Sequence, residues 1–300
     1  MTTSTFEKSA LLERFRDRGE QLLGPLNTGD SSKSNRQKMA KSVNEGITAE
    51  RNEILREIDE LDLDLDERLS QILLANYTSY VAMLEYRNVV WPYEFMAFSR
   101  RIGELWEPFC KLPFAYPKKE LSLYTPDTFR NVRAKIEKQF KEFITELDLD
   151  EDNFSRLEKE YSTVWGYVAS GDVNLSLDLH FEQDGVRYAV DFKSGFSSNE
   201  KGNTNRLLMV GAIYQQLSEK YKILMFVRQE ESKNNNYLQR LMSSPYWRVY
   251  CAGEAYDKIH EFSGFDLASW MKDHIDWRAD ISDAFRSHVV AEGLSDYLTW

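Results

Sequence analysis

The sequence LSLDLHFEQDGVRYAVDFK, residues 175–193, decides the fold that we expect for this chain. It predicts two short strands joined by Asp184 and Gly185, a pair typical of a two-residue hairpin loop with positive φ at both positions. Apolar and polar residues alternate on both sides of this turn. We therefore expect an antiparallel hairpin with one apolar face and one polar face.

Two carboxylates are predicted to meet on the polar face of this hairpin. Counting outward from the turn places Asp178 directly opposite Asp191. Side chains so placed have Cβ atoms roughly 5 Å apart, and like charges there are destabilising. Mg²⁺ would offset the repulsion, because it takes oxygen ligands and is often held by one or two carboxylates. Lys193 projects to the same face and is a candidate to hold a water or to offset phosphate charge. Solvated charges on an ordinary hairpin are the alternative.

This pattern resembles the PD-(D/E)xK nuclease superfamily and, within it, the type II restriction endonucleases. The match is carried by Asp178 on one strand and by Asp191 and Lys193 on the next, although Leu177 replaces the usual proline. The segment that follows, SGFSSNEKGNTNRLL, is similar to the one after the catalytic strand in some restriction enzymes. In that family the two carboxylates bind Mg²⁺ and the lysine helps to orient the attacking water.

The resemblance covers roughly residues 91–111 and 164–265, and it implies a mixed β-sheet flanked by helices. It also implies a Mg²⁺-dependent enzyme that hydrolyses phosphodiester bonds at specific sites in double-stranded DNA and leaves 5′-phosphates. A homodimer on a palindromic site, with a cognate DNA methyltransferase as functional partner, belongs to the same expectation. The alternatives are another nuclease of this fold, acting on RNA, on modified DNA or in repair, and a non-catalytic module that binds DNA or protein.

A third carboxylate is implied as well, because the first core helix of the family often contributes one. The sequence predicts a helix with an apolar stripe within residues 91–114, and Glu104 is our candidate, with Glu107 second. Glu158 and Glu160 precede the hairpin closely and are rival candidates. For Glu104 the alternative role is an ion pair one helical turn away.

The segment after the hairpin is predicted to be a recognition loop. It is rich in Gly, Ser and Asn, and binding residues often lie on loops of a rigid scaffold. We expect Asn203, Asn205 and Arg206 to read base edges and Lys201 to contact phosphate. A simple turn followed by a helix capped by Asn205 is the alternative.

The composition describes an ordinary soluble domain, with 42% hydrophobic and 29% charged residues. No apolar run has signal-peptide or membrane-spanning length, and the two cysteines fit a reducing compartment, so we expect a cytoplasmic protein without membrane association. The net charge of −11 argues against non-specific nucleic-acid binding. Residues 194–250, however, carry eight basic and four acidic side chains, a local positive excess beside the predicted site.

The whole chain is predicted to belong to the α/β class, with a restriction-endonuclease-like core. We expect a largely helical N-terminal region at 1–90, the core at 91–265 with a helical insertion at about 115–160, and C-terminal helices at 266–300. Residues 163–169 are predicted as the first strand of the core. His180 is predicted to be an exposed strand residue next to the carboxylates.

Overall fold

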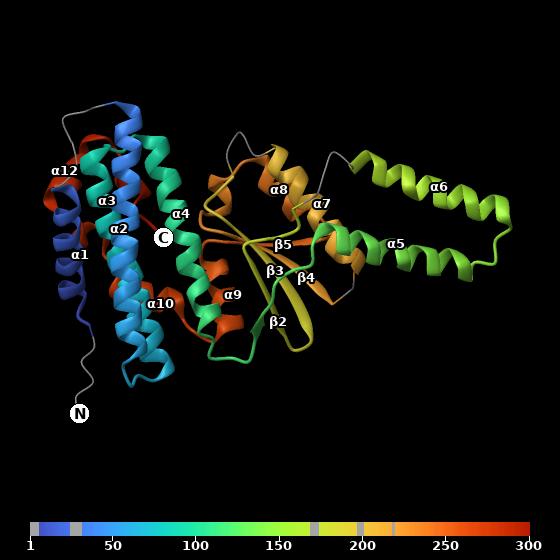
Figure 1. Cartoon of the computed structure of the whole chain (residues 1–300), viewed down its shortest axis with the longest axis horizontal. Coiled ribbons are helices and arrows are strands. Elements are labelled where there is room, and N and C mark those ends of the chain that lie inside the picture. Colours follow the sequence, from blue (N-terminus) through green and yellow to red (C-terminus); the bar gives the residue numbers. More distant parts are fainter. Residues whose placement is uncertain (1–5, 25–31, 169–173, 197–200, 218–219) are drawn as a thin grey trace. The chain divides into compact units, whose positions relative to one another are not determined.

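The computed structural model describes residues 6–24, 32–168, 174–196, 201–217 and 220–300 (Figure 1). The chain divides into two compact units, one formed by residues 1–120 and 252–300 and the other by residues 121–251. The predicted α/β class is confirmed, because a five-stranded mixed sheet flanked by helices lies in the second unit. Among the described residues, no helix is long and apolar enough to cross a membrane.

The first unit is helical. Its helices are α1 (Lys8–Leu23), α2 (Lys33–Asp59), α3 (Leu65–Val90), α4 (Phe95–Ala115), α9 (Gly253–Ser263), α10 (Leu267–His274), α11 (Trp277–Asp280) and α12 (Asp283–Ala291), followed by the 3-10 turn η2 (Ser295–Tyr297). Helix α3 is its centre, since it is buried almost continuously from Leu69 to Tyr86. A helix that is covered all round in this way must pack against several neighbours, and α1, α2 and α4 all contact it (Figure 1).

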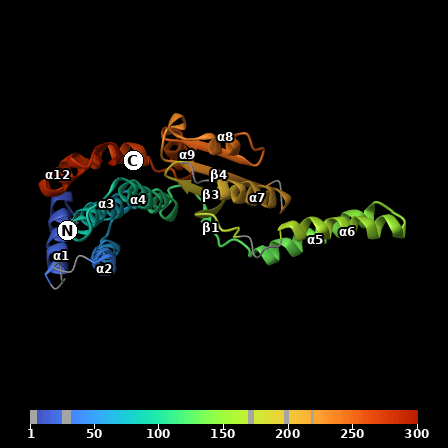
Figure 2. The ribbon, with the colours of Figure 1, turned by 90° about the horizontal axis from the view of Figure 1, so that it is seen from above.

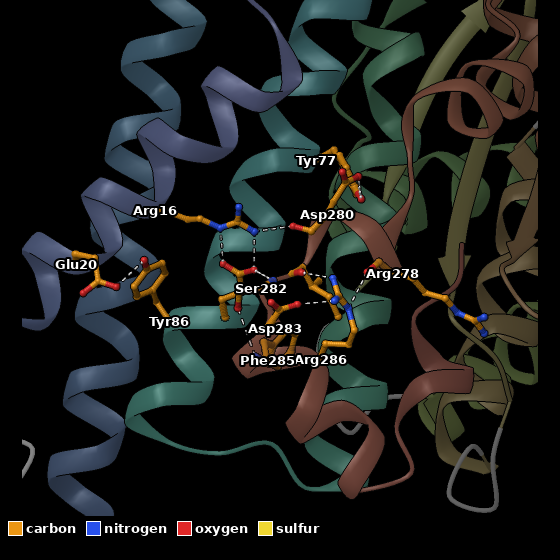
Figure 3. Close-up of polar contacts among 12 residues, drawn as sticks. Arg16, Glu20, Tyr77, Tyr86, Arg278, Asp280, Ser282, Asp283, Phe285 and Arg286 are labelled. Carbon is orange, nitrogen blue, oxygen red and sulfur yellow. Dashed lines mark hydrogen bonds and ion pairs between the residues drawn. The ribbon is translucent and has the colours of Figure 1, made fainter.

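A buried polar network ties α1, α3 and α11 together (Figure 3). The Arg16 guanidinium donates to both carboxylate oxygens of Glu85, at 3.1 and 2.9 Å, and to the backbone carbonyl of Asp280, at 2.6 Å. The Asp280 carboxylate accepts from the Tyr77 hydroxyl at 2.7 Å and from the Lys8 ammonium at 3.0 Å. Glu85 and Asp280 are 6% and 7% exposed, so these partners replace the water that the carboxylates lose.

Helix α4 belongs to this helical unit, whereas its residues were predicted to lie in the nuclease-like core at 91–265. The Trp106 indole donates to the Tyr256 hydroxyl of α9 at 2.8 Å, and the backbone N–H of Lys118 donates to the Ser263 carbonyl at 2.7 Å. These contacts join residues 95–120 to the segment that follows the sheet. Only the folded chain brings the two segments together, because they are more than a hundred residues apart in sequence.

The second unit is built around the sheet. Its elements are β1 (Ser122–Leu123), α5 (Phe129–Glu146), α6 (Glu151–Val168), β2 (Leu179–Gln183), β3 (Val186–Lys193), α7 (Lys201–Leu217), β4 (Tyr221–Val227), the 3-10 turn η1 (Glu231–Lys233), α8 (Asn236–Met242) and β5 (Trp247–Cys251). The strands lie in the order β1-β2-β3-β4-β5, antiparallel as far as β3 and parallel from β3 to β5. The parallel pairs follow from the β3-α7-β4 and β4-α8-β5 crossovers.

One face of this sheet packs on α7, α8 and the start of α5. Its core includes Ala189 of β3, Met225 of β4, Val210 of α7, Leu238 of α8 and Val132 of α5, all essentially inaccessible to solvent. At Gly211 of α7 the helix approaches β5 so closely that a Cβ atom there would lie 2.6 Å from the Trp247 indole nitrogen. The sequence therefore needs a glycine at this contact.

Two local predictions were right and one was wrong. The helical insertion is present as α5 and α6, and the strand expected from the run KILMFVR is β4. Residues 163–168 end helix α6 instead of forming a strand. Tyr161 and Trp165 explain this result, because they continue the apolar face of that helix, with ring centroids 6.1 Å apart. The turn expected at 170–172 lies outside the described residues.

Candidate functional site

The predicted hairpin is confirmed, with the turn and register that the sequence indicates. Asp184 and Gly185 have φ values of 53° and 71°, and Gln183 pairs with Val186. The paired register continues to Leu179 opposite Val190. Asp178 is the next residue outward and Asp191 is its counterpart on β3, so both carboxylates lie at one end of the hairpin.

The Asp191 carboxylate is buried and incompletely paired. Asp191 is 2% exposed, and its Oδ2 atom lies 3.0 Å from the Lys193 Nζ atom. Despite this ion pair, Oδ2 accepts no well-aligned hydrogen bond from the described part of the chain. Burial raises the pKa of Asp191 to about 6, with the Lys193 charge opposing the rise and the Asp178 charge adding to it. Burial of an incompletely paired carboxylate is costly, and a bound cation would reduce that cost.

Asp178 is held beside Asp191 by backbone contacts. Its Oδ2 atom accepts a hydrogen bond of 2.7 Å from the backbone N–H of Phe192. The chain just before it is fixed too, since the Leu177 N–H donates to the His180 Nε2 atom at 3.0 Å and the Tyr214 hydroxyl donates to the Leu175 carbonyl at 2.9 Å. The carboxylate is thereby oriented by groups on β2, β3 and α7.

Lys193 lies at the end of β3, two residues beyond Asp191 and on the same face. Burial lowers its pKa, but the nearby Asp191 and Asp178 carboxylates outweigh that effect, so the pKa lies above its ordinary value. The charge of Arg206 acts in the opposite sense, which places a second cation near this ammonium. Two acidic and two basic side chains are therefore gathered at this end of the sheet.

The prediction for His180 was wrong. The side chain is 5% exposed, with its ring 5.5 Å from that of Tyr124 and 6.0 Å from that of Tyr214. Burial lowers the pKa of His180 to about 4, against a smaller opposing effect of Asp178. The hairpin face that alternation predicts to be polar is in fact covered by α7. Alternation shows which residues share a face, but it does not show what packs on that face.

The four predicted DNA-binding residues lie on a helix and not in a loop. Helix α7 begins at Lys201, so Lys201, Asn203, Asn205 and Arg206 occupy its first two turns, and the predicted cap at Asn205 was wrong. The Arg206 guanidinium donates to the Asn174 carbonyl at 3.2 Å and lies 3.5 Å from the Asn203 side-chain oxygen. Lys201 and Asn205 are exposed. Residues 197–200 of the expected recognition loop lie outside the described residues.

Each candidate for the third carboxylate on α4 forms an ion pair with a basic residue of the same helix. Glu104 lies on α4 in the helical unit, 2.7 Å from Arg100 and 3.5 Å from Arg101. On the same helix Glu107 lies 2.7 Å from Lys111. The role of Glu104 at the site stays a prediction.

The rival candidates for the third carboxylate, Glu158 and Glu160, lie on α6 of the helical insertion. Glu158 is 3.7 Å from Lys141 of α5, and Glu160 is exposed on the same helix. No group of three or more His, Cys, Asp or Glu side chains able to hold a metal occurs among the described residues. Asp178 and Asp191 stay our candidate ligands for a cation.

One neighbour of the site was missed in the sequence. Arg228, at the end of β4, is 8% exposed and donates through Nε and Nη2 to the Ser194 hydroxyl at 3.0 and 2.9 Å. Its backbone N–H also donates to the Lys193 carbonyl at 2.9 Å. The arginine fixes the chain immediately after Lys193. The sequence carries no signal for it, because the contact depends on the parallel pairing of β3 with β4.

No protein-family model, no curated protein and no solved structure matches this chain.

Proposed function

We propose that this protein is a Mg²⁺-dependent, site-specific DNA endonuclease of the type II restriction class, which hydrolyses phosphodiester bonds in double-stranded DNA and leaves 5′-phosphates. One observation carries the proposal: two opposed carboxylates, Asp178 and the buried Asp191, lie beside Lys193 at the end of a β-hairpin. The proposal includes a cytoplasmic location and a cognate methyltransferase that protects the host DNA. The restriction-endonuclease-like topology of the core is part of the same proposal.

The residues present fit a hard divalent cation. The buried Asp191 carboxylate and the neighbouring Asp178 carboxylate supply only oxygen ligands, as Mg²⁺ prefers, and water and phosphate oxygens commonly complete such sites. When bound there, the cation would polarise a phosphoryl oxygen and lower the pKa of a coordinated water. Asp178 and Asp191 are the residues that would hold it.

Lys193 contributes donors and positive charge. An ammonium group has three donors and no acceptor, so it can hold a water and a phosphate oxygen at the same time. Its ion pair with Asp191 keeps the side chain over the carboxylates. Negative charge that develops on the phosphoryl group during hydrolysis would be stabilised from this position.

Arg206 and Lys201 supply the charge for binding the DNA backbone. Arg206 is tethered to the Asn174 carbonyl, in the segment that leads to Asp178, so a phosphate bound by Arg206 would lie close to the carboxylates. Lys201 opens the same helix and is exposed. We assign phosphate contacts to these two side chains and base contacts to Asn203 and Asn205.

The test is cleavage of several unmethylated plasmid and phage DNAs with Mg²⁺ or with EDTA, beside the Asp191→Ala variant. Discrete fragments that need Mg²⁺ and are missing in the variant are the expected result. End labelling should then find 5′-phosphates at a constant sequence. A continuous smear of fragments would indicate a non-specific or repair nuclease instead of a site-specific one.

Intact DNA in every lane would overturn the proposal for unmodified DNA. The same protein would then be tested on RNA and on methylated DNA, and binding without cleavage of any substrate would identify a non-catalytic module.

A further inference from the structure

Helices α5 and α6 form a hairpin that packs on the sheet only at its base. Phe129, Val132 and Ile136 at the start of α5 belong to the core beneath the sheet. Figures 1 and 2 show the two helices side by side, running out from that contact. Along the hairpin, Phe140 of α5 stacks on Tyr161 of α6 with ring centroids 4.1 Å apart. The far half of the hairpin is thus supported by its own two helices.

Both helices carry an apolar seam that this pairing leaves partly open. The seam residues, spaced three or four apart, are Phe129, Val132, Ile136, Phe140, Phe143 and Leu147 along and just after α5, and Phe154, Leu157, Tyr161 and Trp165 along α6. In the far half, Phe143 is 57% exposed, Leu147 45% and Leu157 38%. Two helices can cover each other on one side only, whereas a four-helix bundle closes such seams completely.

Charge is distributed unevenly along the hairpin. Residues 129–138 at its base contain four basic side chains and one acidic side chain, while residues 142–152 at its tip contain six acidic side chains and no basic one. Exposed charges at the two ends of α5 include Arg130 and Arg133 at the base and Glu142 and Glu146 near the tip. An antiparallel copy of the same hairpin would bring each acidic tip against a basic base. A two-fold arrangement places the same patch on both partners, so this match needs no other protein.

We propose that the α5–α6 hairpin docks against the hairpin of a second copy of this chain, antiparallel, to form a four-helix bundle. Two features together identify the partner. The open seam requires an apolar helical surface, and the charge gradient from base to tip is complementary to that of an antiparallel second copy. The proposal does not rest on the proposed chemistry, because dimerisation is measured without DNA or metal.

The test is sedimentation equilibrium of the full chain at micromolar concentrations, with two charge-reversed variants. In the tip variant, Glu142→Lys and Glu146→Lys make both ends of α5 basic. In the base variant, Arg130→Glu and Arg133→Glu make both ends acidic. We expect a dimer for the unaltered chain, a dissociation constant raised about tenfold or more for each variant alone, and a restored dimer when the two variants are mixed.

Controls of equal charge change lie on α2. Glu45→Lys with Glu53→Lys matches the tip variant, and Lys41→Glu with Arg56→Glu matches the base variant, because all four side chains are exposed there. These controls should remain dimeric. A monomeric unaltered chain, dimers that persist in both hairpin variants, or a mixture that stays monomeric would each overturn the proposal. Helical circular dichroism of each variant separates loss of docking from loss of folding.

Discussion

The Asp178 carboxylate accepts a hydrogen bond from the backbone N–H of Phe192, with Oδ2 and N 2.7 Å apart. Phe192 lies between Asp191 and Lys193 on β3. The hydrogen bond therefore fixes the Asp178 carboxylate to the strand that carries Asp191. The two like charges are held together by the fold and cannot drift apart to relieve their repulsion. A bound cation would offset the repulsion between these two carboxylates.

Mg²⁺ should stabilise the protein through these carboxylates. We expect a rise in melting temperature of roughly 3–5 °C at saturating Mg²⁺ relative to EDTA, since a ligand that binds only the folded state stabilises it. Asp178→Asn should abolish the rise while keeping the acceptor for the Phe192 N–H. Asp184→Asn is the matched control, because that residue lies in the turn and asparagine tolerates its positive φ. An equal rise in all three proteins would place the metal elsewhere.

Asp191→Asn should separate catalysis from stability. Cleavage should fall at least about 100-fold, because the cation loses a ligand worth several kcal/mol in the transition state. Without metal at pH 8, the melting temperature should stay the same or rise, since the variant removes a buried charge whose pKa is raised. Differential scanning calorimetry in EDTA, run beside the cleavage assay, checks both parts. A large drop in stability would mean that the carboxylate is a structural group.

Lys193→Gln should reduce the cleavage rate about 100- to 1000-fold, as expected on removal of one charged donor to the phosphoryl group. The Mg²⁺-induced rise in melting temperature should remain, because both carboxylates are intact. Lys41→Gln, at an exposed position on α2, is the control for the loss of one positive charge. If Lys193→Gln cleaves at the normal rate, the lysine is only a partner of Asp191.

Acid should destabilise the fold through His180. Its pKa of about 4 lies below the ordinary value of 6.5, so the unfolded chain binds the proton more readily than the folded chain. The histidine's contribution to stability is complete above pH 6.5 and is lost as the pH falls through 4, by about 3 kcal/mol. Asp191 has the opposite effect, because its pKa of about 6 lies above the ordinary value of 3.8. Its protonation therefore stabilises the folded chain as the pH falls from about 6 towards 3.8. Urea unfolding of the unaltered chain and of His180→Gln isolates the histidine, since only the former should show the extra loss.

Arg16→Met should weaken the helical unit strongly, because it leaves the buried Glu85 carboxylate without its charged partner (Figure 3). Breaking a buried pair on one side costs about 3 kcal/mol or more in the free energy of unfolding. The control is Arg56→Met, whose ion pair with Glu53 is exposed and should be worth less than about 1 kcal/mol. Equal losses in urea unfolding would mean that the network contributes nothing beyond surface charge.

The hairpin shows what alternation and turn chemistry can predict. The Asp-Gly loop fixes its own geometry, and the period of two then fixes which residues oppose each other, so the register of Asp178 and Asp191 follows from local rules alone. The helical pair α5–α6 and strand β4 were predictable for the same reason, because each has a clear period or a long apolar run. The strand predicted at 163–169 failed where a short apolar run fits a helix equally well.

By itself, the sequence determined the hairpin, its opposed carboxylates, the lysine beside them and the helical pair, since these features depend on neighbours along the chain. The tertiary structure alone decided that α7 covers the carboxylate face, that His180 and Asp191 are buried there, and that Arg228 fixes the chain after Lys193. It also decided that α4 joins the C-terminal helices. Burial and long-range pairing depend on which element packs on which face, and the residues of one element do not specify that choice.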